Sequence, residues 1–239
     1  MSMKKEFKLS IVVPAYNEKE RITKMINSYI NFLSMKYDYE IIVVHDGNDG
    51  TGSLIKNVMI DRPNIKLIEF SERQGKGRAI IHGFKECTGE ILAFVDADES
   101  VSPEEFDKLM SALKDVDCAI ASRRAKGAYI PIDKSLKRKI SSKIFNIIVN
   151  MMFDLNIKDT QCGAKVFKKE VIYQVISSLK TKGFEFDVEL LWRIKNGGFK
   201  IKEVPIVWKH DNGSTFSLKY SYNMLISLIK IRLANIKGK

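Results

Sequence analysis

The sequence has few cysteines and no long uncharged run. Its three cysteines, at positions 87, 118 and 162, are odd in number and irregular in spacing, which argues against a disulfide framework and a zinc site. Uncharged runs such as 144–153 have about half of the ~20 apolar residues that cross a bilayer. Pro14 and several charges come too early for a secretory leader. We therefore expect a cytoplasmic protein without a transmembrane helix.

The sequence also lacks a Gly/Pro-rich linker, a low-complexity tract and an internal repeat. Hydrophobic residues make up 45% of the 239 positions, which is enough for a full core. The three histidines, at 45, 82 and 210, show no sign of a catalytic pair. We expect one large domain, or a domain with an appendage, that does not depend on histidine chemistry.

Positive charge is abundant and concentrated in two segments. The net charge is +11, and residues 123–143 hold eight basic side chains against one acid, while 215–239 hold five and none. Basic patches serve nucleic acids or anionic membranes. The apolar residues between the charges favour the membrane, so we expect an anionic membrane surface and no nucleic acid as partner.

Apolar runs alternate with segments of helical period along the first half. The runs lie at 9–14, 40–46, 65–70, 90–96 and 116–122, and helical patterns at 21–33 and 77–85. Apolar strands separated by helices predict a doubly wound, mostly parallel α/β sheet that binds ligands beyond the carboxyl ends of its strands. The second half predicts helices near 136–152, 171–178 and 186–195, a strand at 201–208 and an amphipathic helix at 218–236.

Carboxylates gather at these strand ends. Asp96 and Asp98 are spaced i, i+2 on extended chain, so both point to one side. Magnesium takes one or two carboxylates and completes its shell with water and phosphate oxygens. The alternative is that both are polar residues leaving a strand. Ser102 to Glu105 has the form of a helix start with a capping box, and Glu99 fits either group.

Several motifs together resemble family 2 glycosyltransferases. They are PAYNE at 14–18, D-G-T at 49–51, R-x-G-K-G-R-A at 73–79 and D-A-D at 96–98. Downstream, SRR at 122–124, RKIS at 138–141, DTQCGAKVF at 159–167, FEFDVELL at 184–191 and EVPIVW at 203–208 resemble the polyprenyl-phosphate branch, the dolichyl-phosphate mannose and glucose synthases.

The resemblance implies a GT-A-like nucleotide-binding fold, Mg²⁺ or Mn²⁺, and inverting transfer of a hexose from UDP-glucose or GDP-mannose to a polyprenyl (dolichyl) phosphate at the inner membrane face. It implies one domain over 1–217, with a nucleotide-binding part at about 1–122, an acceptor part at about 123–217, and a terminal amphipathic helix at 218–239. By position, the donor-site residues are Pro14, Tyr16, Glu18, Asp46, Lys76, Asp96, Ala97 and Asp98.

The same resemblance assigns the metal and the acceptor. Asp98 would ligate the metal, with Glu99 a second candidate because it stands near the place where the branch often has an amide. Arg123 and Arg138 would hold the acceptor phosphate, and Gln161 would lie near the sugar with the 187–189 segment. His45 stands where the family usually has the first of two aspartates. The expected catalytic residues are Asp96, Asp98, Arg123, Arg138 and Gln161.

Two other functions are compatible with parts of the pattern. A sugar-nucleotidyltransferase would also place carboxylates and a metal at strand ends, but it normally has a Gly- and Arg-rich loop after the first strand. A non-enzymatic basic protein that binds membrane or nucleic acid would explain the charge but not the D-A-D motif. Cys162 is expected to be a packed small residue, because the proposed reaction needs no covalent step.

Overall fold

The computed structural model describes residues 8–131, 136–209 and 218–237, and within its helices the side chains of 136–141, 218–223 and 235–237 are not described. The strands are β1 (Lys8–Ala15), β2 (Asp38–His45), β3 (Ile65–Glu69), β4 (Ile91–Val95), β5 (Cys118–Ser122), β6 (Ala164–Lys168) and β7 (Ile201–Pro205). The helices are α1 (Ile22–Leu33), α2 (Thr51–Met59), α3 (Lys76–Glu86), α4 (Pro103–Ala112), α5 (Leu136–Phe153), α6 (Lys169–Val175), α7 (Phe186–Asn196) and α8 (Leu218–Lys237), with a short 3-10 helix η1 (Ile176–Ser178) after α6.

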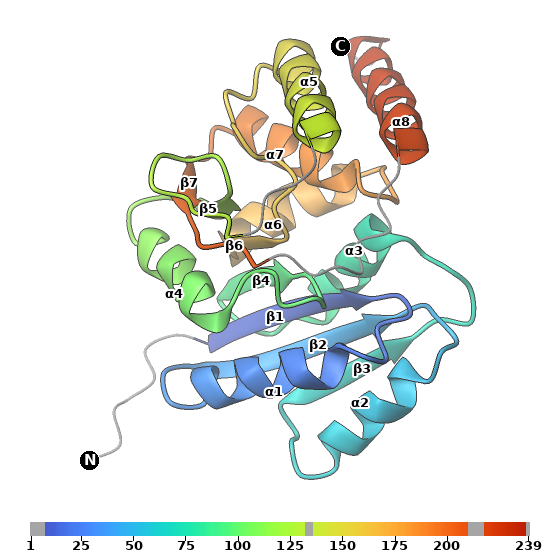
Figure 1. The fold of residues 1–239 in the computed structure, drawn as a ribbon, viewed down its shortest axis with the longest axis vertical. Coiled ribbons are helices and arrows are strands. Elements are labelled where there is room, and N and C mark those ends of the chain that lie inside the picture. Colours follow the sequence, from blue (N-terminus) through green and yellow to red (C-terminus); the bar gives the residue numbers. More distant parts are fainter. Residues whose placement is uncertain (1–7, 132–135, 210–217, 238–239) are drawn as a thin grey trace.

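The seven strands form one mixed sheet (Figure 1) in the order β3-β2-β1-β4-β6-β5-β7. Every pair is parallel except those of β6, which is antiparallel to both β4 and β5. The predicted doubly wound, mostly parallel plan is confirmed. Helix α2 was not predicted, and β7 is shorter than the predicted strand at 201–208.

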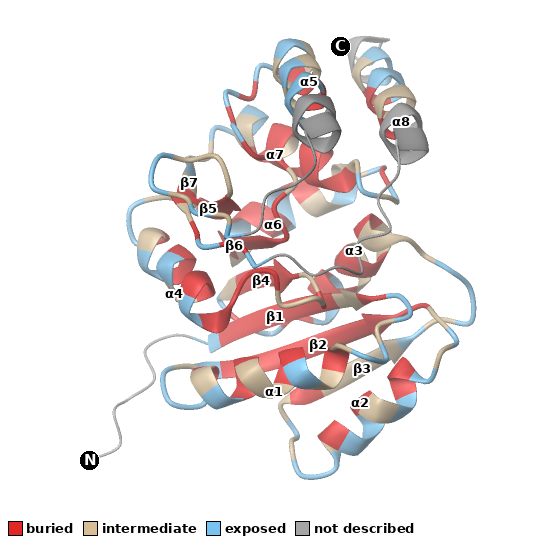
Figure 2. Cartoon of the chain, in the orientation of Figure 1, coloured by how far each residue is buried: buried red, intermediate tan, exposed pale blue. Residues whose placement is uncertain are grey.

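Both faces of the sheet are covered, so the central strands β1, β2 and β4 are mostly red with buried residues in Figure 2, while the outer strands β3 and β7 are less buried. On one face, β1 residues such as Ile11 and Val13 pack with α1 and α4. On the other face, Val12, Leu92 and Phe94 pack with α3, α6 and α7, and with buried side chains of α5 and α8. Strands of this kind are apolar on both sides, which is why their runs are continuous in the sequence.

The register brings several strand ends to one edge of the sheet. Ala15 pairs with His45, and Val95 pairs with Ala164 at the start of the antiparallel β6. Ser122 ends β5 in parallel with β7. The residues that follow β1, β2, β4 and β5, and those that precede β6, therefore meet at the same edge.

The start of α4 is only partly as expected. Ser102 is the N-cap, and its Oγ accepts a hydrogen bond from Glu105 N at 3.4 Å, with Pro103 as the first helical residue. The predicted capping box is wrong in its second half, because the Glu105 carboxylate instead accepts from Val207 N at 3.1 Å and from Lys108. Glu105 thus ties α4 to the segment after β7.

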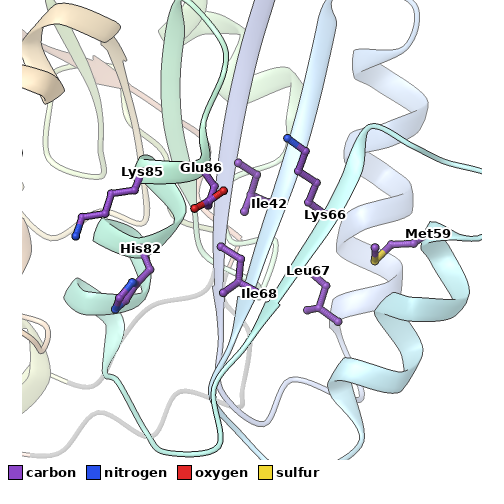
Figure 3. A pocket seen from close by; sticks show the side chains of 8 residues that line it. All are labelled: Ile42, Met59, Lys66, Leu67, Ile68, His82, Lys85 and Glu86. Carbon is purple, nitrogen blue, oxygen red and sulfur yellow. The ribbon is translucent and has the colours of Figure 1, made fainter.

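A pocket of about 380 Å³ lies along β3 and the C-terminal half of α3. Figure 3 shows Ile42 and Ile68 at its floor, with His82 and Lys85 reaching from α3. None of the predicted site residues lines it. The strand ends, and not this pocket, are therefore the candidate for chemistry.

A buried carboxylate, Glu40 on β2, joins three segments at the opposite end of the sheet. Its Oε1 accepts from Ser10 Oγ at 2.6 Å and from Thr88 N at 2.7 Å, and its Oε2 accepts from Lys66 Nζ at 2.8 Å. Burial alone would raise the Glu40 pKa, but the hydrogen bonds from Lys66, Ser10 and Thr88 outweigh it and lower the pKa to about 2. The charged form is therefore stabilised by folding.

Replacing Glu40 with Gln should make the protein less stable at neutral pH and less sensitive to acid. Because the folded pKa lies below the unfolded value, this stabilisation is complete above about pH 5 and is lost as the pH falls toward 2, and it amounts to roughly 2–3 kcal/mol. Urea unfolding of E40Q and wild type at pH 7, 5 and 3 measures it. The exposed neighbour Asp38→Asn is the control. If lowering the pH from 7 to 3 reduced the free energy of unfolding equally in E40Q and wild type, the low pKa assigned to Glu40 would be contradicted.

Candidate active site

Asp96, the first residue after β4, is held against the start of β6. Asp96 N donates to Gly163 O at 2.9 Å. A Cβ at position 163 would lie 2.1 Å from Asp96 Oδ2 and 2.6 Å from its Cγ, which is far inside van der Waals contact. Only glycine at 163 therefore leaves room for the Asp96 carboxylate in this position.

The two acids that follow point to different places. Asp98 Oδ1 accepts from Ser100 N at 3.0 Å, and the side chain stays partly exposed. Glu99 has a positive φ of 54°, and its Oε1 accepts from Ser28 Oγ of α1 at 2.7 Å. The reversed backbone at Glu99 directs its carboxylate toward α1, so its predicted role as a second metal ligand receives no support from the geometry.

Glu18, Asp96 and Asp98 follow the ends of β1 and β4, and we call the part of the sheet that carries them the donor edge, after their predicted role; it carries more negative charge than its neighbours neutralise. Burial raises the pKa of Glu18, Arg21 beside it opposes the rise, and Asp98 and Asp96 add to it. Burial likewise raises the pKa of Asp96, against the effect of Lys76 and with that of Asp98. Carboxylates that raise each other's pKa favour a bound cation.

A divalent cation fits this edge if the ligand supplies part of its shell. In the described part of the chain, no three His, Cys, Asp or Glu side chains are grouped as a protein-only metal site. Mg²⁺ is typically held by one or two carboxylates together with substrate phosphates and water. Asp98, with Asp96 beside it, matches that donor set.

Lys76, at the start of α3, faces two carboxylates. Its Nζ lies 2.8 Å from Asp96 Oδ1 and 3.5 Å from Asp187 Oδ2, and the side chain is 10% exposed. Asp187 in turn pairs with Lys165 at 2.5 Å. Lys76 thus lies beside Asp96, in a network of charges that extends into the core.

Asp46 shapes the loop that leads into α3. Its Oδ2 accepts from Gln74 N at 2.7 Å and from Gly75 N at 3.0 Å. Gly75 has a φ of 83°, and the backbone N–H of Gly77 donates to the Lys182 carbonyl at 2.9 Å. The glycines of R-x-G-K-G therefore shape the entry into helix α3.

The remaining donor-site candidates lie around the end of β1. Pro14 is half-buried within the strand, Ala97 is buried, and Tyr16 is exposed. The Arg73 guanidinium stands 4.1 Å above the Tyr16 ring. Tyr16 and Arg73 therefore form a cation–π pair beside the end of β1.

His45 replaces the family's first aspartate and lies under the 47–52 loop. It is buried, with Nε2 3.8 Å from Asp49 Oδ1 and Nδ1 3.8 Å from Glu69 Oε1. Asp49 Oδ2 accepts from Lys19 N at 3.0 Å, and Asp49 Oδ1 accepts from Thr51 Oγ1 at 2.6 Å. His45 therefore supports the loop from below, while Asp46 faces the start of α3.

On the acceptor side, Arg123 is fixed by Asp159. Nε and Nη2 of Arg123 donate to the two oxygens of Asp159 at 2.7 and 2.8 Å, and Arg123 N donates at 2.9 Å. Burial opposes the charge on Arg123, but Asp159 outweighs it and raises the guanidinium pKa. The guanidinium also lies 5.5 Å from the Trp208 ring centroid. Arg123 is thus a permanently charged group in one orientation.

The other acceptor-side candidates are less sharply placed. Gln161 Nε2 donates to Phe184 O at 3.4 Å and lies 3.9 Å from the sulfur of Met224 on α8. Arg138 belongs to α5, and its side chain lies outside the described residues. Arg124 Nη2 donates to Ser142 Oγ of α5 at 2.5 Å. This hydrogen bond joins the residues that follow β5 to helix α5.

Three residues of the neighbourhood were missed from the sequence. Asp159, Gly163 and Lys165 lie within or before β6 and contact predicted site residues. A lysine inside the apolar run AKVF was the available signal, because a buried lysine needs a partner. Glu189, by contrast, holds the backbone of 180–181, since its Oε2 accepts from Thr181 N at 2.8 Å.

The family assignment follows from comparison with known proteins. A profile of Glycosyl transferase family 2 matches residues 10–176. This chain belongs to that family. The glycosyltransferase is 32% identical to a dolichyl-phosphate beta-glucosyltransferase of Saccharomyces cerevisiae, over 98% of this chain and 76% of that one. It is 28% identical to a polyprenol monophosphomannose synthase of Mycolicibacterium smegmatis, over 96% of this chain and 87% of that one.

Solved structures share the fold. A glucosyl-3-phosphoglycerate synthase from Mycobacterium tuberculosis, in complex with Mn²⁺, UDP and phosphoglyceric acid, is 19% identical with a TM-score of 0.70, and the match covers 96% of this chain and 78% of that one. A mannosyltransferase from Pyrobaculum calidifontis, in complex with GDP-Man and Mn²⁺, is 18% identical with a TM-score of 0.65. That match covers 98% of this chain and 65% of the other. The GT-A-like fold is thereby confirmed, and family membership disfavours both alternative functions.

Cys162 is fully buried, as expected for a packed residue, and burial raises its thiol pKa to about 12. A thiol of that kind is not a nucleophile at neutral pH. The enzyme is therefore expected to work without a covalent cysteine intermediate.

Replacing Gly163 with Ala should impair sugar transfer more than stability. The added methyl would push the Asp96 carboxylate out of place, and we expect at least a tenfold loss of transfer with about 1–3 kcal/mol of destabilisation from overpacking. Radiolabelled sugar transfer and urea unfolding give the two quantities. The control is Gly197→Ala at the end of α7, where the nearest atoms are those of the Phe199 ring at 3.1 Å. Undiminished transfer by folded G163A would contradict the assignment of Asp96.

Proposed function

We propose that this glycosyltransferase moves a hexose, with inversion, from a nucleoside diphosphate sugar to a polyprenyl (dolichyl) phosphate at a membrane surface. The supporting observation is the juxtaposition of two charged groups of opposite sign. Asp96 and Asp98 form the acidic donor edge, and the short segment 159–163 links it to Arg123, because Gly163 O accepts from Asp96 N at 2.9 Å and Asp159 accepts from Arg123 Nε at 2.7 Å. The named activities of the relatives from yeast and mycobacteria support the same acceptor class.

The chemistry of this acceptor suits the residues present. A phosphate monoester is already anionic at neutral pH, so its attack on the sugar carbon needs orientation and charge neutralisation more than a general base. Arg123 would bind the acceptor phosphate, with Arg138 as the second expected guanidinium. Asp96 would hold the ribose or the sugar of the donor.

Asp98 would hold the metal ion, together with the diphosphate of the donor. Mg²⁺ or Mn²⁺ bound there would neutralise the charge that develops on the leaving diphosphate. The Mn²⁺ in the complexes of two structural relatives supports a divalent ion. The domain division that we infer places the donor part at about 1–122, the acceptor part at 123–217 and the terminal helix at 218–239.

The donor sugar is proposed to be glucose, carried by UDP. Several relatives, including those of yeast, Dictyostelium discoideum and Drosophila melanogaster, are named as dolichyl-phosphate beta-glucosyltransferases. GDP-mannose is the second candidate, favoured by the mycobacterial relative. A panel of labelled nucleotide sugars, with polyprenyl phosphate and Mg²⁺ or Mn²⁺, decides between them by the label found in the lipid phase.

Asp98→Ala should abolish transfer of label to the lipid while leaving the fold intact. The side chain is partly exposed, so the free energy of unfolding should change by less than about 0.5 kcal/mol. Transfer assays and circular dichroism test this, with the exposed Asp115→Ala as the matched control. If D98A turned over at the wild-type rate, the assignment of Asp98 to the metal would be wrong. If wild type transferred label to the lipid from none of the common donors, the proposed reaction would be wrong.

The proposed membrane surface is formed by α5 and α8, which contact each other (Figure 1). Each helix has a buried apolar side, with Phe145, Val149, Met224 and Leu228 in the core. Each also has exposed apolar residues at helical spacing, namely Ile144, Ile147 and Met151 on α5, and Ile229 and Leu233 on α8. In the described part of the chain, no helix is long and apolar enough to span a bilayer.

This exposed apolar set lies next to basic residues, which is the pattern of helices that rest in a membrane interface. Lys143 and Lys230 are exposed beside it, and the two basic segments of the sequence, 123–143 and 215–239, include parts of these helices. An anionic membrane would bring the acceptor lipid to Arg123. We infer a peripheral protein on the cytoplasmic side.

Serine at both Ile147 and Met151 should weaken binding to anionic vesicles. We expect at least a fivefold lower bound fraction in sedimentation with phosphatidylserine vesicles, because apolar insertion is lost, and wild-type binding should weaken with salt. The control carries serine at Met35 and Ile60, which are 73% and 76% exposed elsewhere on the surface. Equal binding by the α5 variant and wild type would place the membrane surface on other elements.

A further inference from the structure

Lys165, in the middle of β6, is fully buried, and the proposed reaction does not use it. Its side chain is 0% exposed. The ammonium donates to Cys162 O at 2.9 Å and to Asp187 Oδ1 at 2.5 Å, and it lies 5.0 Å from the ring centroid of Phe94. Buried lysines are rare unless they are paired, so the sheet accepts this one only because three partners surround its charge.

Asp187 joins Lys165 to the donor edge. One carboxylate oxygen faces Lys165, and the other lies 3.5 Å from Lys76 Nζ. Lys76 Nζ is 2.8 Å from Asp96 Oδ1, and it too lies over the Phe94 ring, at 5.5 Å from the centroid. Four alternating charges therefore run from β6 through α7 and α3 to β4, and they sum to zero.

Lys76 stands between two competing carboxylates. Its ammonium lies closer to Asp96, at 2.8 Å, than to Asp187, at 3.5 Å, and Asp187 is also paired with Lys165. Without Lys165, Asp187 would be a buried carboxylate whose remaining cation among the described residues is Lys76, and an unpaired buried charge is strongly unfavourable. The ammonium of Lys76 would then be drawn toward Asp187 and away from Asp96.

We propose that Lys165 is a positioning residue of the donor site, which keeps Lys76 beside Asp96 by occupying Asp187. Lys165 is enclosed by protein and touches no substrate, so it acts only through Asp187 and Lys76. The inference rests on the proposed function in one respect: that Asp96 and its neighbours bind the nucleoside diphosphate sugar. It assigns to the antiparallel strand a part in donor binding as well as in the fold.

The test compares Lys165→Met, Asp187→Asn and the double variant. Lys165→Met should raise the donor KM and the dissociation constant of UDP with Mn²⁺ at least tenfold, without changing the KM for polyprenyl phosphate. Adding Asp187→Asn removes the competing charge, so the double variant should recover at least threefold of the lost UDP affinity. Calorimetry measures UDP binding, and steady-state kinetics separates KM from kcat.

Two further variants separate positioning from stability. Lys165→Gln keeps hydrogen-bond donors but removes the charge. This variant should bind UDP at least threefold more weakly than wild type. If Lys165→Met does not fold, Lys165→Gln takes its place in the comparison. Glu40→Gln is the matched control, because Glu40 is a buried carboxylate paired with a lysine at the other end of the sheet. It should lower stability and leave the UDP affinity unchanged.

The outcomes distinguish this inference from the proposed function. Wild-type UDP affinity in folded Lys165→Met or Lys165→Gln overturns the inference, and so does a double variant that binds UDP no better than folded Lys165→Met. If wild type and the variants show the expected order of UDP affinities but no sugar reaches the lipid, the inference stands and the proposed acceptor is wrong.

Discussion

The candidate site depends on the reversed direction of one strand, β6. Because β6 is antiparallel to β4 and β5, its first residues lie where the parallel strands end. The segment 159–163 therefore reaches the donor edge, where Asp159 binds Arg123 and Gly163 O accepts from Asp96 N. A parallel strand in the same place would carry this segment to the opposite edge of the sheet.

The charges of the site are arranged for two anions that must approach each other. The donor edge holds Glu18 and Asp96, and burial together with nearby carboxylates raises the pKa of each, which suits a cation-bound diphosphate. Arg123, which we propose to bind the acceptor phosphate, has its charge secured by Asp159. An arginine that is already paired has a fixed orientation and loses little conformational entropy on binding a phosphate. A cation at the donor edge and the guanidinium of Arg123 would together reduce the electrostatic repulsion between the two anionic substrates.

Much of the fold could be predicted from the sequence, because the apolar runs of buried parallel strands are local signals. The positions of Asp96 and Asp98 followed from the rule that ligands bind beyond strand ends, and the Ser102 cap followed from its motif. The place of β6 could not be predicted, since it depends on pairing between Val95 and Ala164, which are far apart in the chain. The direction of the Glu99 carboxylate depends on a positive φ that the residue type does not announce. The roles of Asp159 and Lys165 depend on partners that only the folded chain brings near.

The carbonyl of Lys182 ties the second half of the chain to the first half. It accepts hydrogen bonds from Gly77 N and Arg78 N at the start of α3, and the Phe186 side chain occupies the space that a Cβ on Gly77 would need. The first turn of α3, which carries Lys76, is therefore completed by backbone from the segment before α7. A fragment ending near residue 122 would keep every strand-end carboxylate of the donor edge and still lack the partners that shape it. The residues up to about 122 are therefore a region of the sequence and not an independent module.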